Sequence, residues 1–225
     1  MKIRAIVLDI EGTIAPIAFV RDVLFPFART RLPGFLRDHA ADPAVAAEIA
    51  QIAQLAPGAD PLAALMGWMD ADAKIPPLKS LQGLIWQDGF DSGVLQGRIY
   101  PDVPPRLQQW RAAGIALYIY SSGSVAAQQM LLQHSDHGDL RPLFAGYFDT
   151  RTGAKRDSAS YRSIAATIGL PGEACLFLSD VAAELAAARA AGLLCGQLVR
   201  DEDGTLGDEG YSNYHDFTQI ELPAD

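Results

Sequence analysis

Residues 5–13 read Ala-Ile-Val-Leu-Asp-Ile-Glu-Gly-Thr. An apolar run that predicts a buried strand ends here in two carboxylates, Asp9 and Glu11. In an open α/β sheet, groups at the carboxyl end of a strand lie at the mouth of the ligand crevice. Two acids at such a point can divide the work, one as nucleophile or metal ligand and the other as proton donor. Asp and Gly also favour a plain turn, so this stretch alone leaves both interpretations open.

Short continuous apolar runs predict further strands. Such runs are typical of strands covered on both faces of a parallel sheet. The runs are Ile3–Leu8, Ile115–Tyr120, Cys175–Ser179 and Leu194–Val199. Helical patterns alternate with the later runs, over Pro101–Ala113, Val125–His134, Ser160–Gly169 and Val181–Ala191. We therefore predict an α/β fold: a Rossmann-like parallel sheet with helices on both faces and right-handed connections.

The segment from Ile14 to Gly97 interrupts this alternation. It is rich in Ala, Leu and Gln and has no convincing strand. It predicts helices over Val20–Arg31, Pro43–Leu55, Pro61–Lys74 and Leu78–Asp88. Asp42 and Asp60 are predicted N-caps, because each stands before a proline at a first helical position.

Two domains follow from this pattern. We predict an α/β core over residues 1–15 and 98–225, and an all-helical cap over residues 16–97 that is inserted after the first strand. An insert that enters beside Asp9 and Glu11 would lie above them like a lid. That placement favours a site over a plain turn.

Composition and charge limit the partners. The 225 residues are 49% hydrophobic and 20% charged, which is ordinary for a folded protein with a sizeable core. The net charge of −9 argues against nucleic acid or an anionic membrane as partner. It allows an anionic small molecule, because a metal ion and one lysine can reverse the local field. No apolar run approaches the length of a membrane span. We expect no signal peptide, because a strand is predicted within a few residues of Met1. We expect a cytoplasmic monomer whose two cysteines are reduced.

Two motifs after the insert suit phosphate. Ser121 and Ser122 begin a Ser-Ser-Gly-Ser turn between a strand and a helix, where hydroxyls and backbone N–H groups can bind phosphate oxygens. Simple capping of the helix by Ser124 is the competing interpretation. Lys155 lies in a turn before a helix that Ser158 or Ser160 is predicted to cap. A lysine there can neutralise a phosphate, although most lone loop lysines are merely solvated.

A second strand also ends in an acid. Asp180 follows the run Cys175–Ser179, and Glu184 stands four residues later on the same helical face. Acids in a first helical turn also favour the helix dipole, which is the competing explanation. Together with Asp9, Asp180 could complete an oxygen ligand set for Mg²⁺, an ion that needs few protein carboxylates.

The ordered set of acid pair, hydroxyls, lysine and acid resembles the haloacid dehalogenase-like hydrolase superfamily, and the likeness extends over the whole chain. Longer strings resemble one family within it, the enolase-phosphatases of methionine salvage (acireductone synthases). The strings are Asp-Ile-Glu-Gly-Thr at 9–13, Phe-Val-Arg-Asp-Val-Leu-Phe-Pro at 19–26, Leu-Gln-Gly-Leu-Ile-Trp-Gln-Asp-Gly at 81–89, Tyr-Ile-Tyr-Ser-Ser-Gly-Ser at 118–124, and Gly-Ala-Lys at 153–155 with Ser158, Ser160 and Tyr161.

The resemblance implies a small phosphorylated substrate, 2,3-diketo-5-methylthiopentyl-1-phosphate, which is enolised and then dephosphorylated to an acireductone. It implies one Mg²⁺ per chain, held by Asp9, Asp180 and the backbone carbonyl of Glu11. Asp9 would be the nucleophile and Glu11 the proton donor. Lys155, with Ser121 and Ser122, would hold the phosphoryl group. The enolisation base is open, with Glu11 as the first candidate because its side chain reaches farther than Asp.

Alternatives from other classes remain. The nearest is a phosphatase of the same superfamily that acts on another small phosphate ester without enolase activity. A dehalogenase has no need for an acid at Glu11, and a catalytically silent phosphate-binding module has no need to keep the full set of acids and lysine.

Other residues suit structural roles. Trp68 and Trp86 are expected to pack the helical insert. The segment from Tyr211 to Phe217 is expected to cover a sheet edge, and Arg200–Gly210 resembles a flexible stretch.

Overall fold

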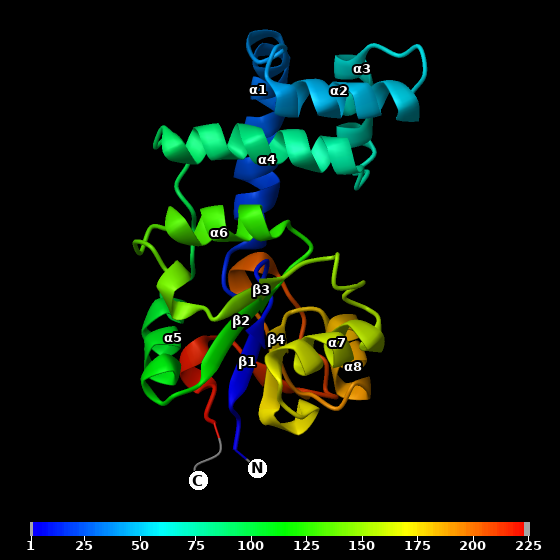
Figure 1. Cartoon of the computed structure of the whole chain (residues 1–225). Coiled ribbons are helices and arrows are strands. Elements are labelled where there is room, and N and C mark those ends of the chain that lie inside the picture. The colour runs from blue at the N-terminus through cyan, green and yellow to red at the C-terminus, as the bar shows by residue number, and fades with distance from the viewer. Residues whose placement is uncertain (1, 223–225) are drawn as a thin grey trace. The chain divides into compact units, whose positions relative to one another are not determined.

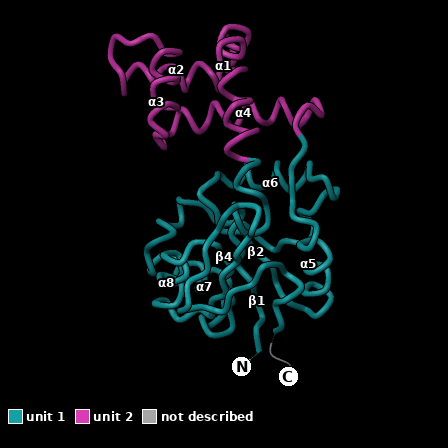
Figure 2. Tube along the Cα trace, turned by 180° about the vertical axis from the view of Figure 1, so that it is seen from behind, with its two compact units in different colours: residues 1–19, 96–225 teal, residues 20–95 magenta. Residues whose placement is uncertain are grey.

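The computed structural model describes residues 2–222. Their contacts divide the chain into two compact units (Figure 2). The core unit comprises Met1–Phe19 and Gln96–Asp225, and the helical unit comprises Val20–Leu95. In the part of the chain that the structure describes, no helix is long and apolar enough to cross a membrane.

The core unit is built on one parallel sheet. Its strands are β1 (Ala5–Leu8), β2 (Ala116–Tyr120), β3 (Gly146–Phe148), β4 (Cys175–Ser179), β5 (Leu194–Leu198) and β6 (Ser212–Tyr214). They lie in the order β3-β2-β1-β4-β5-β6, and every neighbouring pair is parallel. The predicted α/β class is confirmed. The strands β3 and β6 were not predicted, because three residues are too few to form a recognisable apolar run. β6 does cover a sheet edge, as expected for its segment.

Helices cover both faces of the sheet. The helices α5 (Val103–Ala112) and α6 (Val125–Gln133) lie on one side, and α7 (Ser158–Ile168) and α8 (Ala182–Ala190) lie on the other (Figure 1). This division follows from right-handed crossovers in a sheet that grows in both directions from β1. Short 3₁₀ turns join these elements: η2 (Arg141–Leu143), η3 (Gly172–Ala174), η4 (Asp201–Asp203) and η5 (Phe217–Gln219).

The N-caps of two of these helices test the sequence directly. Ser124 caps α6 as the alternative interpretation allowed, since its hydroxyl accepts from the N–H of Ala127 at 3.3 Å. The prediction for α7 is wrong. Asp157 caps that helix by accepting from Ala159 N at 2.8 Å, and Ser160 uses its hydroxyl elsewhere. A carboxylate just outside the helix satisfies an N–H that a serine within the first turn cannot reach.

The helical unit contains the predicted helices; α2 has the predicted ends, and the other helices have shifted ends. It holds most of the π-helix η1 (Phe19–Leu24), followed by α1 (Phe25–Asp38), α2 (Pro43–Leu55), α3 (Pro61–Asp70) and α4 (Pro76–Asp91). α1 continues past Pro33, although a proline inside a helix cannot donate the backbone hydrogen bond and its ring crowds the preceding turn. α3 ends four residues earlier than predicted, and Asp72 in the following turn has a positive φ of 48°. Asp42 and Asp60 cap α2 and α3 as predicted.

The helical unit has an apolar core of its own. The largest fully buried side chains there are Leu32, Ile52, Leu65, Leu81 and Ile85. Trp68 and Trp86 pack against this core, as expected, and the indole N–H of Trp86 donates to Leu24 O at 2.8 Å. A helical segment with its own buried cluster can hold its shape largely through these contacts.

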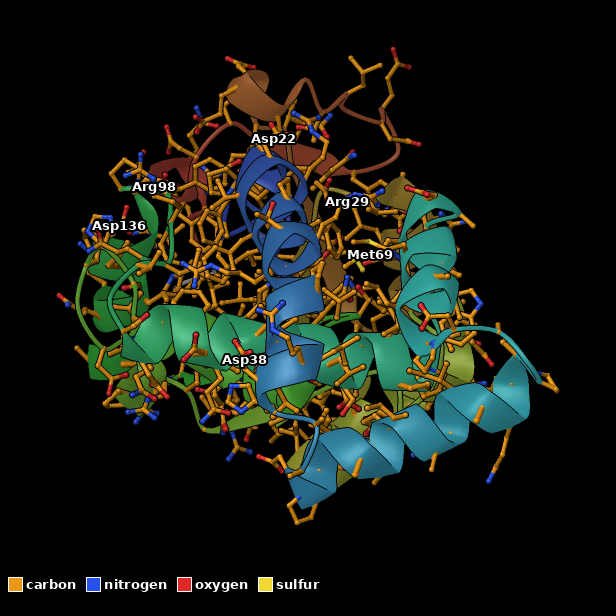
Figure 3. The ribbon with its side chains drawn as sticks, turned by 90° about the horizontal axis from the view of Figure 1, so that it is seen from above. Asp22, Arg29, Asp38, Met69, Arg98 and Asp136 are labelled. Carbon is orange, nitrogen blue, oxygen red and sulfur yellow. The ribbon has the colours of Figure 1, made fainter. Side chains whose placement is uncertain are left out.

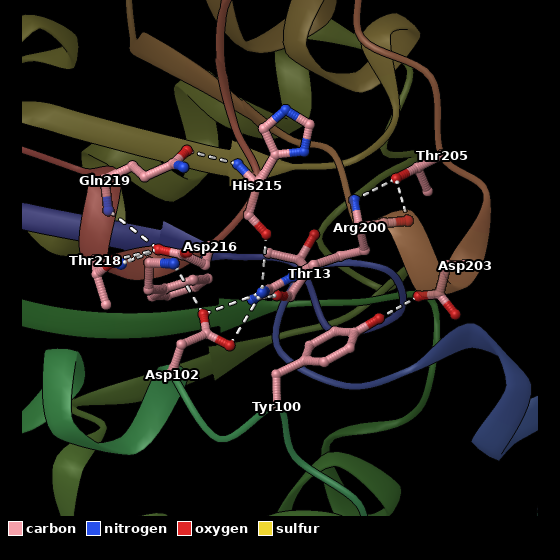
Figure 4. A network of polar contacts seen from close by, with 11 residues as sticks. Thr13, Tyr100, Asp102, Arg200, Asp203, Thr205, His215, Asp216, Thr218 and Gln219 are labelled. Atoms are coloured by element: carbon pink, nitrogen blue, oxygen red, sulfur yellow. Dashed lines mark hydrogen bonds and ion pairs between the residues drawn. The ribbon is translucent and has the colours of Figure 1, made fainter.

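The segment after β5 is not the flexible stretch that its composition suggests. Arg200 is only 4% exposed and stands in a network of polar contacts (Figure 4). Its guanidinium donates to both carboxylate oxygens of Asp102 at 3.0 Å and to Thr13 O at 2.8 Å. Asp203 accepts from Ile17 N at 3.1 Å and from the hydroxyl of Tyr100. The composition suggests flexibility because charges and glycines are usually solvated, but Arg200 and Asp203 are held by these contacts.

The chain that re-enters the core unit is also held there. Gly97 N donates to His134 O at 2.8 Å, and Asp136 N donates to Gly97 O at 2.8 Å. Seen from above, Arg98 lies beside Asp136, with 3.5 Å between their charged groups (Figure 3). The loop after α6 therefore fixes the segment that follows the helical unit.

Candidate active site

The strand order brings the predicted motifs together. β1 lies between β2 and β4, and Leu8 is aligned with Ile119 and with Leu178. Asp9 therefore continues β1 at the same edge at which Ser121 continues β2 and Asp180 continues β4. This is the edge at which open α/β sheets bind ligands.

Asp9 and Lys155 form the centre of the site. The ammonium of Lys155 lies 2.6 Å from Asp9 Oδ1 and 2.6 Å from Glu184 Oε2. Only 10% of the Lys155 side chain and 7% of the Asp9 side chain are exposed. The backbone N–H of Ile10 also donates to Asp9 Oδ1, at 2.7 Å. Lys155 is thus a buried cation held by two carboxylates, whereas a lone loop lysine is ordinarily solvated.

Glu184 and Ser179 belong to this cluster, although sequence reasoning did not place them in the site. Ser179 Oγ lies 3.2 Å from Asp9 Oδ2 and 3.1 Å from Glu184 Oε2, and it accepts from Val181 N at 3.1 Å. The available signals were weak. Ser179 is the one hydroxyl in an apolar run, and Glu184 shares a helical face with Asp180.

The side chain of Asp180 lies very close to Gly12, in the turn that follows β1. Gly12 has a φ of 67°, and a Cβ at this position would lie 2.5 Å from Asp180 Oδ2. Only glycine combines that conformation with that approach. Asp180 Oδ1 is buried and has no hydrogen-bond partner within residues 2–222. Burial, reinforced by the nearby charge of Asp9, raises the pKa of Asp180 to about 7.

Burial and neighbouring charges also shift the pKa values of Glu184 and Lys155. Burial, together with the charge of Asp9, raises the pKa of Glu184 to about 7. Burial alone would lower the pKa of Lys155, but Asp9 and Glu184 outweigh that effect and raise it. Lys155 therefore stays charged. Three acids face one ammonium, so the cluster would stabilise an added cation.

A magnesium ion fits this donor set. Mg²⁺ prefers oxygen ligands, needs few protein carboxylates and keeps several waters. The buried, unpartnered oxygen of Asp180 and the excess of carboxylates over ammonium groups are what such an ion would satisfy. Across residues 2–222 no three His, Cys, Asp or Glu side chains are grouped as a metal site. The predicted set needs only two carboxylates, Asp9 and Asp180, with the backbone carbonyl of Glu11.

The remaining predicted residues lie around this cluster. Glu11 is half-buried in the turn after β1, and its backbone pairs with that of Ala15. Ser121 is buried at the end of β2, where its hydroxyl accepts from Gly123 N at 3.3 Å, and Ser122 beside it is exposed. The buried amide of Gln128 donates to Gly123 O at 2.8 Å, and this contact helps to hold the turn that contains Ser121 and Ser122.

The site is therefore built on a parallel sheet whose central strand ends in a buried aspartate, beside a buried lysine and further acids. The family model of the haloacid dehalogenase-like hydrolases matches residues 3–192. The chain is 50% identical over 226 residues to the enolase-phosphatase E1 of Gluconobacter oxydans, covering 99% of both chains. It is 51% identical to the enolase-phosphatase E1 of Serratia proteamaculans, covering 98% of this chain and 97% of that one.

A solved structure agrees with these relatives. The UTR4 protein of Saccharomyces cerevisiae superimposes with a TM-score of 0.84 at 31% identity, and the match covers 97% of this chain and 100% of that one. The chain belongs to the enolase-phosphatase E1 family of haloacid dehalogenase-like hydrolases and is a phosphatase enzyme.

Proposed function

We propose that the protein is a Mg²⁺-dependent enolase-phosphatase of L-methionine salvage. It would convert 2,3-diketo-5-methylthiopentyl-1-phosphate to an acireductone, 1,2-dihydroxy-3-keto-5-methylthiopentene, and phosphate. The observation that carries the proposal is the buried cluster of Asp9, Lys155 and Glu184 at the end of β1. The names of relatives that are about half identical over nearly the whole chain supply the substrate class.

In the dephosphorylation step, Asp9 attacks phosphorus while the bond from phosphorus to the ester oxygen breaks. Glu11 donates its proton to that leaving oxygen. Water then attacks the aspartyl-phosphate and gives its proton to Glu11, which releases phosphate and restores Asp9. Lys155, Ser121 and Ser122 bind the phosphoryl oxygens, and Lys155 offsets their charge.

Asp9, Asp180 and the carbonyl of Glu11 would hold Mg²⁺. When bound, the ion supplies a positive charge that stabilises negative charge on oxygen. The buried position of Asp180 and its close approach to Gly12 suit a ligand that is fixed before the ion arrives.

Enolisation moves a proton before the phosphate leaves. A base takes a proton from carbon, the carbon–carbon double bond forms, and the carbonyl oxygen becomes an enolate oxygen that Lys155 stabilises. A proton from water then gives the enol hydroxyl. Glu11 is the candidate base, because it lies half-buried in the turn after β1 and is one methylene longer than Asp. The helical unit, inserted directly after the strand that carries Asp9, is proposed to act as the cap.

A direct assay separates this function from its nearest alternative. Purified protein with Mg²⁺ is mixed with the diketone phosphate, and the ultraviolet absorbance of an enol is recorded alongside phosphate release. An enol that accumulates before or with phosphate supports the bifunctional enzyme. Phosphate release from other small esters, with no enol from the diketone, would instead support a plain phosphatase.

The protein is also proposed to be a monomer, and light scattering of the same sample tests this.

A further inference from the structure

Three hydroxyl groups bind three consecutive carbonyls of the lysine turn. Tyr120 Oη donates to Gly153 O at 3.0 Å, Ser160 Oγ donates to Ala154 O at 2.8 Å, and Tyr161 Oη donates to Lys155 O at 2.7 Å. We call Tyr120, Ser160 and Tyr161 the hydroxyl clamp. None of them has a part in the chemistry proposed above.

The clamp is anchored in the core of the molecule. Tyr120 and Tyr161 are fully buried, and Ser160 is 2% exposed. The two tyrosine rings meet edge to face with centroids 5.5 Å apart, and Tyr161 packs in the same way on Phe177 at 5.0 Å. Close-packed rings keep their rotamers, so their hydroxyls are fixed points to which the turn is attached.

The turn itself is shaped to accept the clamp. Gly153 has a φ of 145°, and a Cβ there would lie 2.1 Å from Ser160 Oγ. A side chain at position 153 would therefore be strained and would also displace the serine. Ala154 O accepts a second hydrogen bond, from Asp157 N at 3.0 Å, which joins the turn to the start of α7.

Lys155 is held at both ends as a result. Its carbonyl is bound to Tyr161 in the core, and its ammonium is bound to Asp9 and Glu184 in the site. A lysine has a long flexible stem, so a mobile backbone would spread the ammonium over many positions. A fixed backbone leaves the stem only a few ways to reach the two carboxylates.

We propose that Tyr120, Ser160 and Tyr161 are positioning residues that act through Lys155. Their hydroxyls fix the backbone of residues 153–155, so that the Lys155 ammonium is already in position when the phosphoryl group binds. The proposal rests on the role of Lys155 in the proposed function. It concerns the placement of that side chain and not the identity of the substrate.

The test removes one hydroxyl at a time. Tyr161→Phe and Tyr120→Phe keep the rings, and Ser160→Ala removes only an oxygen. Tyr147→Phe is the matched control, because the buried Tyr147 hydroxyl has no hydrogen-bond partner in the described chain. Binding of inorganic phosphate with Mg²⁺ present is measured by calorimetry. We expect Tyr161→Phe to weaken binding by about tenfold and Tyr147→Phe to leave it unchanged.

A double-mutant cycle separates positioning from general damage. If Tyr161 acts through Lys155, its substitution has almost no further effect on phosphate binding once Lys155→Met is present. An equal loss in both backgrounds, or no loss in the wild-type background, would overturn the proposal. So would a crystal structure of the Tyr161→Phe variant in which Lys155 keeps both carboxylate contacts, and this measurement decides the question even where Lys155→Met binds no phosphate.

The outcomes also separate this inference from the proposed function. A wild-type protein that binds phosphate but forms no enol from the diketone contradicts the enolase assignment and leaves the clamp intact. A wild-type protein that makes the acireductone, with a Tyr161→Phe variant that performs equally well, overturns the clamp alone.

Discussion

Both carboxylate oxygens of the buried Asp9 contact polar side chains of the site. One carboxylate oxygen receives the ammonium of Lys155, and the other lies near Ser179 Oγ. We predict that Asp9→Asn lowers phosphate release by at least about a thousandfold, because an amide is too poor a nucleophile to replace the carboxylate. Continuous phosphate detection measures the rate, and circular dichroism checks the fold.

The matched control for this change is Asp38→Asn, at an exposed acid in the last turn of α1. It is expected to keep full activity. Phosphate release by Asp9→Asn at a near wild-type rate would remove Asp9 from the role of nucleophile.

Asp180 is the residue whose environment most favours a cation. Its Oδ1 is buried without a hydrogen-bond partner in the described residues, and its pKa is raised to about 7 by burial and by Asp9. Asp180→Asn is predicted to weaken Mg²⁺ binding by at least about tenfold, since the amide has no charge to offer the ion. Calorimetric titration with Mg²⁺ measures the change. An unaltered titration curve, matching that of the exposed-site variant Asp88→Asn, would exclude Asp180 from the ligand set.

Among the helices, α2 gives the clearest test of a local signal. Asp42 Oδ1 accepts from Ala44 N at 2.9 Å, and a proline follows at the first helical position. Removing an N-cap of this kind costs about 1 kcal/mol, so Asp42→Ala should lower the free energy of unfolding by that amount. Glu48→Ala, inside the same helix, is expected to change it by less than about 0.5 kcal/mol. Urea denaturation compares the two, and equal losses would contradict the capping role.

The ends of elements show where local patterns stop being informative. α2 begins and ends where the pattern predicts, because a proline and a capping aspartate mark its start. The start of α7 was predicted less well. Ser158 and Ser160 are plausible caps by residue type, yet Asp157 takes the role and Ser160 binds Ala154 O. Which of three neighbouring polar residues caps a helix depends on the path of the preceding turn.

At the scale of the whole molecule, Arg200 joins parts of the chain that are far apart in sequence. Its side chain is 5% exposed, and its guanidinium binds Asp102 and Thr13 O. Arg200→Met would leave the largely buried carboxylate of Asp102 without its charged partner, although Phe217 N still donates to it. We predict a loss of about 3 kcal/mol or more in the free energy of unfolding, measured by chemical denaturation.

A surface pair provides the comparison. Arg141 and Asp139 are each 40% exposed, so Arg141→Met should cost no more than about 1 kcal/mol. Adding Asp102→Leu to Arg200→Met should restore part of the lost stability, because it removes the unpaired charge. If Arg200→Met were no more damaging than Arg141→Met, the network around Arg200 would have no stabilising role.

The parallel sheet, the helical insert and the residue types at the strand ends could all be predicted from the amino-acid sequence. These are properties of local patterning: continuous apolar runs predict buried strands, and parallel strands bring their ends to one edge. For this reason Asp9, Ser121 and Asp180 were predicted to lie near one another from residues more than fifty positions apart. The proximity of Glu11 to Asp9 could be predicted from the first motif alone, because the two residues are two positions apart.

The pairing of buried polar groups depends instead on how the chain packs in three dimensions. Ser179 and Glu184 join the site, the hydroxyl clamp binds the lysine turn, and Arg200 meets Asp102 across ninety-eight residues of chain. Nothing in the local pattern of those residues indicates their partners. Burial makes each such group depend on a partner, and the packed chain determines which partner lies within reach.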